Sequence, residues 1–247
     1  MKTGLLLLAL GVLAATGATA DPRLDEKVYA PDVQSREAGL ELRTARQNGG
    51  ASDGEATLVV EEEYGLNDRL SLALVGAVER SPDRASRLSS LGLEAVVYTG
   101  KLPRLGVDTG VYLEYKHGFG GEADVAEGKL LFARTAGRFQ GLLNLIVERS
   151  FGPSGQTFAS YGYAASATFR TVGALRLGGE AFGDLGTDHG FDGRHGAYLG
   201  PQLLWEGRPA GSPVEFGVDA GWLVPVGTDR AETRSQLRFA LELERRF

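Results

Sequence analysis

The chain contains no cysteine, which excludes both a disulfide framework and a cysteine that could carry a lipid anchor. Only three histidines are present, so few residues are available for metal binding or acid–base catalysis. Beyond the first twenty residues, no apolar run is long enough to cross a membrane as a helix. Proline is sparse, with 9 residues, whereas glycine is abundant, with 36. Without disulfides or a lipid anchor, the fold must be held by its own packing and backbone hydrogen bonds.

The N-terminus has the pattern of a secretory signal peptide. Lys2 precedes the apolar run 5–15, and Ala18, Thr19 and Ala20 are the small residues that a signal peptidase reads. We therefore predict a signal peptide over residues 1–20; its removal with Lys2 changes the net charge from −6 to −7. Residues 21–35 are charged and contain two prolines, and we predict a periplasmic N-terminal segment without regular structure.

The last stretch of the chain alternates between apolar and polar residues. Leu237, Phe239 and Leu241 share one parity, and Arg238 and Glu242 share the other. A period of two places these sets on opposite faces of a β-strand. The same alternation predicts twelve strands, at residues 36–46, 55–65, 69–80, 87–99, 105–117, 124–135, 138–149, 158–170, 173–184, 195–206, 213–225 and 233–247.

An alternating strand that ends on Phe247 resembles the closing strand of bacterial outer-membrane β-barrels. The resemblance implies that Phe247 is part of the signal read by the outer-membrane assembly machinery. It also implies an all-β fold for residues 36–247, an antiparallel up-and-down barrel of about 12 strands in the outer membrane of a Gram-negative bacterium. The even strand number allows both termini to lie on the periplasmic side.

Alternation alone also fits a soluble β-sandwich or a lipocalin-like barrel, because both have one apolar strand face. Aromatic residues favour the membrane barrel. Tyr64, Phe169 and Trp205 fall near the predicted periplasmic ends, whereas Tyr115 and Trp222 fall near the outer ends, as at the two interfaces of a bilayer.

The predicted faces carry a prediction for single substitutions. Leu143 and Val218 are expected to face lipid, so arginine at either position should be costly. Arginine at the neighbouring Asn144 or Asp219 is expected to be tolerated far better.

Pro201 does not fit its predicted strand, because a closed barrel needs every backbone donor and proline has none. We expect a bulge or a local break there, next to Gly200.

The histidines could serve a metal site or an enzyme active site. Residues 184–195 bring Asp184, Asp188, Asp192, His189 and His195 into one predicted outer loop, but their spacing matches no compact metal motif, and Asp and Gly are ordinary loop residues. A barrel enzyme would need the His–Ser pair two residues apart seen in outer-membrane phospholipases and lipid A deacylases, or the Asp-x-His of omptin-like proteases. The sequence has neither pattern. We predict no enzyme activity, no metal site and no cofactor.

The predicted inward positions are rich in acids. The residues expected to line the lumen are Glu94, Asp108, Glu114, Lys116, Glu148, Arg176, Glu180, Glu215, Asp219 and Arg238. Excess negative charge in a confined passage attracts cations. We therefore predict a porin-like channel for small solutes that prefers cations, with outer-membrane lipid as its surroundings and no nucleic-acid partner. A plugged, non-conducting barrel that serves an envelope secretion or efflux system is the alternative, and a barrel enzyme is the second.

Overall fold

The computed structural model describes residues 24–82, 84–156, 158–191, 196–227, 230 and 232–247. The predicted signal peptide lies outside the described residues. The strands are β1 Glu37–Asn48, β2 Ala56–Asn67, β3 Leu70–Arg80, β4 Arg87–Leu102, β5 Val107–Gly118, β6 Asp124–Ala136, β7 Phe139–Phe151, β8 Ala159–Arg170, β9 Leu175–Thr187, β10 Ala197–Gly207, β11 Val214–Val226 and β12 Ser235–Arg246. Among the described residues, no helix is long and apolar enough to cross a membrane.

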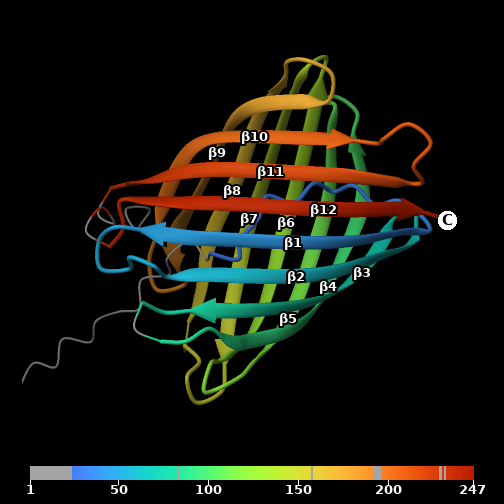
Figure 1. Cartoon of the computed structure of the whole chain (residues 1–247). Helices are drawn as coiled ribbons and strands as arrows, with labels where there is room; N and C mark the ends of the chain where they lie inside the picture. The colour runs from blue at the N-terminus through green and yellow to red at the C-terminus, as the bar shows by residue number, and fades with distance from the viewer. Residues whose placement is uncertain (1–23, 83, 157, 192–195, 228–229, 231) are drawn as a thin grey trace, which may run out of the picture.

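The strands form one closed antiparallel barrel in which each strand pairs with its sequence neighbours (Figure 1). Closure comes from β1 and β12, which pair along their whole length from Glu37 with Arg246 to Asn48 with Ser235. A closed sheet leaves no unpaired edge, which is the condition for a sheet to stand in lipid. The predicted fold class is confirmed, and every predicted strand end lies within three residues of the observed one.

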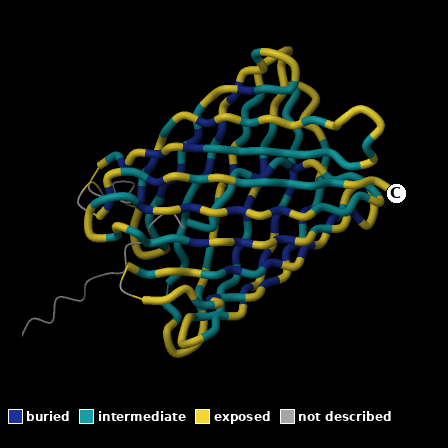
Figure 2. The backbone as a smooth tube through the Cα atoms, viewed as in Figure 1, coloured by how far each residue is buried: buried dark blue, intermediate teal, exposed yellow. Residues whose placement is uncertain are grey.

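Side chains alternate between the two faces of the wall (Figure 2). On β4, Leu93 is 62% exposed and its neighbour Glu94 only 4%. The same contrast recurs around the barrel, with leucines outside and charged, polar or small residues inside, except where two apolar clusters are buried in the lumen. In a soluble sandwich the apolar face would be the buried one, so this wall is built for lipid outside and water or polar contacts inside.

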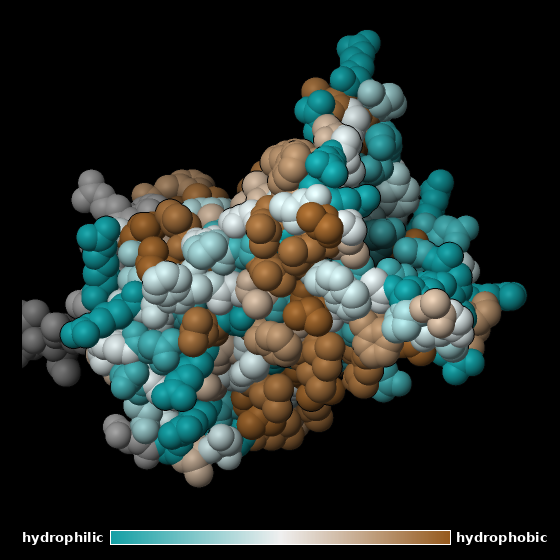
Figure 3. Space-filling model, turned by 45° about the horizontal axis from the view of Figure 1, so that its top comes forward, coloured by the Kyte–Doolittle hydropathy of each residue, from teal (hydrophilic) through white to brown (hydrophobic). Residues whose placement is uncertain are grey.

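Apolar side chains gather on the exterior, and the face in Figure 3 shows brown patches over the middle and hydrophilic residues toward the ends. The outward residues include Leu74, Leu113 and Leu145, all exposed. Phe139 and Phe169 pair at the end where β7 begins, while Trp222 is exposed toward the other end. Aromatic side chains near both ends of an apolar exterior are typical of a bilayer-spanning barrel.

Pro201 interrupts one of its two ladders. It pairs with Gly179 of β9, but the β10–β11 ladder passes from Leu199 to Gln202 without pairs for Gly200 or Pro201. The register is the same on both sides of this gap, so the predicted irregularity is a local break and not a bulge. Gly200 lies so close to β11 that an added Cβ would be 1.9 Å from the Trp222 carbonyl oxygen.

This close approach gives a stability prediction. Gly200→Ala should destabilise the barrel by at least about 1–3 kcal/mol, because the new methyl group must push two backbone strands apart. Urea titration of the protein folded into lipid vesicles measures the change. Gly141→Ala is the control, since its Cβ would meet only the edge of the Phe139 ring at 3.4 Å; equal losses in the two variants would contradict the role assigned to the contact.

Candidate functional site in the barrel lumen

Residues 24–35 run through the inside of the barrel, visible in Figure 1 as the dark-blue trace behind β1. We call residues 24–34 the lumen segment. Leu24 lies toward the end where β1 finishes, and Gln34 lies beside Gly65 at the opposite end. The sequence pattern predicts a periplasmic stretch without regular structure; the stretch has no regular structure but lies inside the barrel. The predicted topology makes the Leu24 end the outer end.

Lys27 of the lumen segment is held by two carboxylates of the wall. Its Nζ lies 2.8 Å from Glu41 Oε2 and 3.3 Å from Glu61 Oε1. Arg43 contacts both of these glutamates, with Nη1 at 2.9 Å from Glu61 Oε2, and also donates to the Asp25 carbonyl oxygen at 3.2 Å. Two cations and two anions thus form one network, which satisfies charges that would be costly to bury alone.

Two further ion pairs hold the start of the segment to the opposite wall. Lys116 of β5 lies 2.9 Å from Asp25 Oδ2, and Lys129 of β6 contacts Glu26. Both lysines also pair with a wall glutamate, Lys116 with Glu114 and Lys129 with Glu127. Asp25 and Glu26 therefore each share a lysine of the wall with a wall glutamate.

Asn144 of β7 fastens the segment backbone. The Tyr29 N–H donates to Asn144 Oδ1 at 2.7 Å, and Asn144 Nδ2 donates to the Tyr29 carbonyl at 2.9 Å. Asn144 is completely buried. The expectation that arginine is well tolerated at Asn144 does not fit this site, because arginine would lose the acceptor and has no space. Sequence parity correctly turned Asn144 inward but could not reveal its partner.

Two apolar clusters fill the lumen at the same level. Tyr29 packs with Val96, Tyr112 and Leu131, and its ring centroid lies 4.5 Å from that of Tyr112. The adjacent Val28 packs against a second cluster on the other side, which consists of Ala164, Phe182, Tyr198 and Leu223. Neighbouring residues of an extended chain point in opposite directions, so Val28 and Tyr29 together close the cross-section.

Glycines on the inward face make room for the segment. A Cβ on Gly110 would lie 2.7 Å from Pro31 Cβ, and a Cβ on Gly65 would lie 1.9 Å from the Gln34 carbonyl oxygen. Glycine inside a strand often marks the close approach of another backbone. Inward glycines together with a charged, proline-containing N-terminal segment are the sequence signal for this site.

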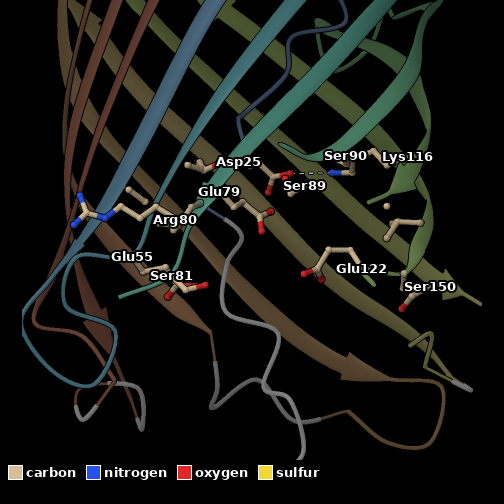
Figure 4. Close-up of a pocket in the computed structure, with 16 residues that line it drawn as sticks. Asp25, Glu55, Glu79, Arg80, Ser81, Ser89, Ser90, Lys116, Glu122 and Ser150 are labelled. Atoms are coloured by element: carbon tan, nitrogen blue, oxygen red, sulfur yellow. Dashed lines mark hydrogen bonds and ion pairs between the residues drawn. The ribbon is translucent and has the colours of Figure 1, made fainter. Parts of the chain in front are cut away.

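The lumen segment divides the interior into separate cavities. The outer vestibule, about 330 Å³, is shown in Figure 4, where Asp25 and Lys116 are joined by a dashed line and Arg80 extends away from them toward β1. Its rim includes Glu55, in the loop between β1 and β2. Burial raises the pKa of the Glu55 carboxyl, against the smaller opposing effect of a hydrogen bond with Ser52.

Two cavities lie beyond the segment. The central cavity, about 260 Å³, is bounded by the segment, by β8–β12, and by residues of β1, β2, β4 and β7. The inner vestibule, about 400 Å³, opens at the opposite end from the outer vestibule. The two cavities adjoin each other, because they share the lining residues Asp32, Glu63, Glu206, Gly217, Glu242 and Glu244. The acids lining the inner vestibule are Asp32, Glu37, Glu63, Glu206, Glu215, Glu242 and Glu244, against Arg208 and Arg246 as bases.

Seven of the ten predicted lumen residues fall into two groups. Glu94, Glu114 and Lys116 are buried against the lumen segment, with the Tyr29 hydroxyl 3.2 Å from Glu94 Oε2. On the other side, Glu180, Asp219 and Arg238 line the central cavity and Glu215 the inner vestibule.

Gln202 Nε2 donates to Asp219 Oδ2 at 2.8 Å, and the Arg238 guanidinium lies 4.3 Å from the Phe182 ring centroid.

The remaining predicted residues lie away from these cavities. Arg176 is buried and donates to Thr168 Oγ1 at 3.0 Å. Asp108 pairs with Lys101 at 3.3 Å near the end of β5. Glu148 lies in the β7 ladder opposite Glu127.

Lys27, Tyr29 and Asn144 were absent from the predicted set of site residues. They form the part of the lumen that holds the segment.

The loop considered for a metal is described only in part. Asp192 and His195 lie outside the described residues. Of the described ones, His189 Nε2 lies 3.8 Å from Asp188 Oδ1, with both side chains exposed. Within the described ranges, no group of three or more His, Cys, Asp or Glu side chains could hold a metal ion.

No family model and no curated protein matches the sequence. Solved structures do match. The outer-membrane channel COG4313 of Pseudomonas putida F1 has 12% identity and a TM-score of 0.58, with 90% of this chain and 98% of that chain covered. The KdgM porin in complex with disordered oligogalacturonate has 12% identity and a TM-score of 0.49, with 85% and 99% covered. LpxR from Salmonella typhimurium has 12% identity and a TM-score of 0.48, with 85% and 100% covered.

Two findings decide the class of protein to which the chain belongs: it shares its fold with the COG4313 channel, and its closed wall has an apolar exterior. The chain is an outer-membrane β-barrel. This confirms the family resemblance read from the final strand and the outer-membrane location. Phe247 closes the barrel seam, where its N–H donates to the Arg36 carbonyl at 3.0 Å; its role as an assembly signal stays a prediction.

Proposed function

We propose that this barrel is a narrow channel for small solutes that prefers cations. The observation that carries the proposal is the charge of the adjoining inner vestibule and central cavity, whose lining holds more carboxylates than basic groups. Fixed negative charge in a confined, low-dielectric passage raises the local concentration of cations and lowers that of anions. The outer vestibule has the same sign, with Asp25, Glu55, Glu79 and Glu122 against Arg80 and Lys116.

Replacing the shared acids should reduce selectivity. Glu63→Gln, Glu242→Gln and Glu244→Gln combined should move the reversal potential in a salt gradient toward that of an unselective pore, because three fixed charges leave the passage. Planar-bilayer recording of purified protein measures the shift. In the unmodified protein, selectivity should also fade at 1 M salt, where screening acts over ~3 Å.

The control is Glu62→Gln, which removes a carboxylate from the exposed outer face of β2 next to Glu63. This variant should keep the unmodified reversal potential, since its charge lies outside the passage. Anion preference in the unmodified protein, or an equal shift in both variants, would contradict the proposal.

A second candidate function is a plugged barrel that serves an envelope secretion or efflux system as a structural partner. The lumen segment favours it, because Val28 and Tyr29 fill the cross-section between the vestibules. Absence of conductance under every condition would support this reading over the channel.

A further inference from the structure

The outer vestibule and the central cavity are separated at a single level, by residues 25–29. The outer vestibule is lined by Leu24 and Asp25, and the central cavity by Lys27, Val28 and Tyr29. The space between them, beside Glu26 and Tyr29, measures about 10 Å³. That is about the smallest volume that can hold one water molecule. A hydrated ion does not fit in this void while the segment is in place.

We propose that the lumen segment is a tethered gate, which closes the passage as seen here and opens it by leaving the wall while the barrel stays intact. The inference rests on the proposed channel function and names how that channel is controlled. The tether is the direct continuation of the segment into β1 at Glu37.

The wall does not need the segment for its own hydrogen bonds. Every strand pairs with two neighbours, and β1 pairs with both β2 and β12 over nearly its full length. The segment is fixed by side chains: the ion pairs of Asp25, Glu26 and Lys27, the two bonds of Asn144 to Tyr29, and the packing of Val28 and Tyr29 against the two apolar clusters. Contacts of this kind can be exchanged for water without breaking the β-ladder.

The wall behind the segment is suited to become a pore lining. Departure of the segment would uncover Glu41, Glu61, Glu94, Glu114 and Glu127 with Arg43, Lys116 and Lys129. This surface is charged and still has more acids than bases, so the opened passage keeps the sign of the vestibules.

A reversible cross-link tests the gate. The natural chain has no cysteine, so Pro31→Cys with Gly110→Cys introduces the only pair. The Cβ atoms would start 2.7 Å apart, and a small shift of the irregular segment brings them to the ~3.8 Å of a disulfide. We expect the oxidised barrel to show no channel openings in planar bilayers and to regain them on addition of dithiothreitol. The Gly110→Cys single variant, which cannot cross-link within the chain, should not respond to the reductant.

A second variant loosens the gate instead of locking it. Lys27→Met with Tyr29→Ala removes the ion pairs of Lys27 with Glu41 and Glu61 and the aromatic ring that fills the cross-section. The fraction of time that the channel is open should therefore rise above that of the unmodified protein. Retained barrel folding is verified by circular dichroism and by the electrophoretic shift on heating. The gate is supported if the double-cysteine barrel loses its channel openings on oxidation and the loosened variant shows more openings than the unmodified protein.

The outcomes separate the gate from the channel. Equal conductance in the oxidised, reduced and loosened proteins would overturn the gate and leave the channel function standing. No conductance in any of them, including the loosened variant, would overturn both and favour the plugged structural barrel.

Discussion

Leu143→Arg should destabilise the folded barrel by about 2–4 kcal/mol, because the guanidinium would stand in the hydrocarbon of the bilayer. Leu143 is 39% exposed in the structure, on the outer face of β7, and its ladder neighbours Phe132 and Ala165 lie on the same face. No water reaches this face to solvate the charge, and a neutral guanidinium is not available since arginine stays protonated. Equilibrium folding into phosphatidylcholine vesicles in urea measures the loss.

The matched control is Asp219→Arg on the inner face of β11. Asp219 borders the central cavity, so an arginine there can reach water and the nearby Glu180 and Glu242. Its cost should be much smaller than that of Leu143→Arg, and consists mainly of the lost bond from Gln202. If the two substitutions cost the same, the assignment of outer and inner faces is wrong.

Asn144→Leu should release the lumen segment from the β7 wall. Leucine has a similar size but neither donor nor acceptor, so the N–H and the carbonyl of Tyr29 both lose their partner. Each unsatisfied buried group costs about 1–3 kcal/mol. The exchange of the Tyr29 amide hydrogen should therefore accelerate by at least about tenfold, the equivalent of 1.4 kcal/mol. Hydrogen–deuterium exchange with mass spectrometry of the peptide around Tyr29 detects it, and needs no channel activity.

Gln140→Leu is the control, since Gln140 also faces inward on β7 and borders the central cavity. It replaces an amide by the same apolar side chain without touching the Tyr29 backbone bonds. We expect the exchange rate at Tyr29 to stay unchanged in this variant. Unchanged exchange in Asn144→Leu as well would mean that the ion pairs of Lys27 and Lys129 hold the segment without Asn144.

The sequence by itself determined the wall of the barrel. The number of strands and the face that each side chain takes follow from a period-two pattern, which is contained in the residues of each strand alone. The outward position of Leu93 and the inward position of Glu94 are therefore predicted without any information about β5. Strand ends were less certain, because turn residues are read from a few positions. The break at Pro201 was foreseeable for the same local reason, since proline lacks the backbone donor that a ladder requires.

Only the tertiary structure decided what fills the lumen. Tyr29 and Asn144 are 115 positions apart, and Lys129 and Glu26 are 103 apart. No local pattern connects such residues, because they meet only after twelve strands have closed. Parity correctly turned Glu94 and Glu114 inward but could not say whether water or another part of the chain would face them. The charge of the interior can thus be predicted from the residue pattern of each strand. The division of the interior into vestibules cannot, because it depends on an irregular segment whose position is set by contacts from many strands at once.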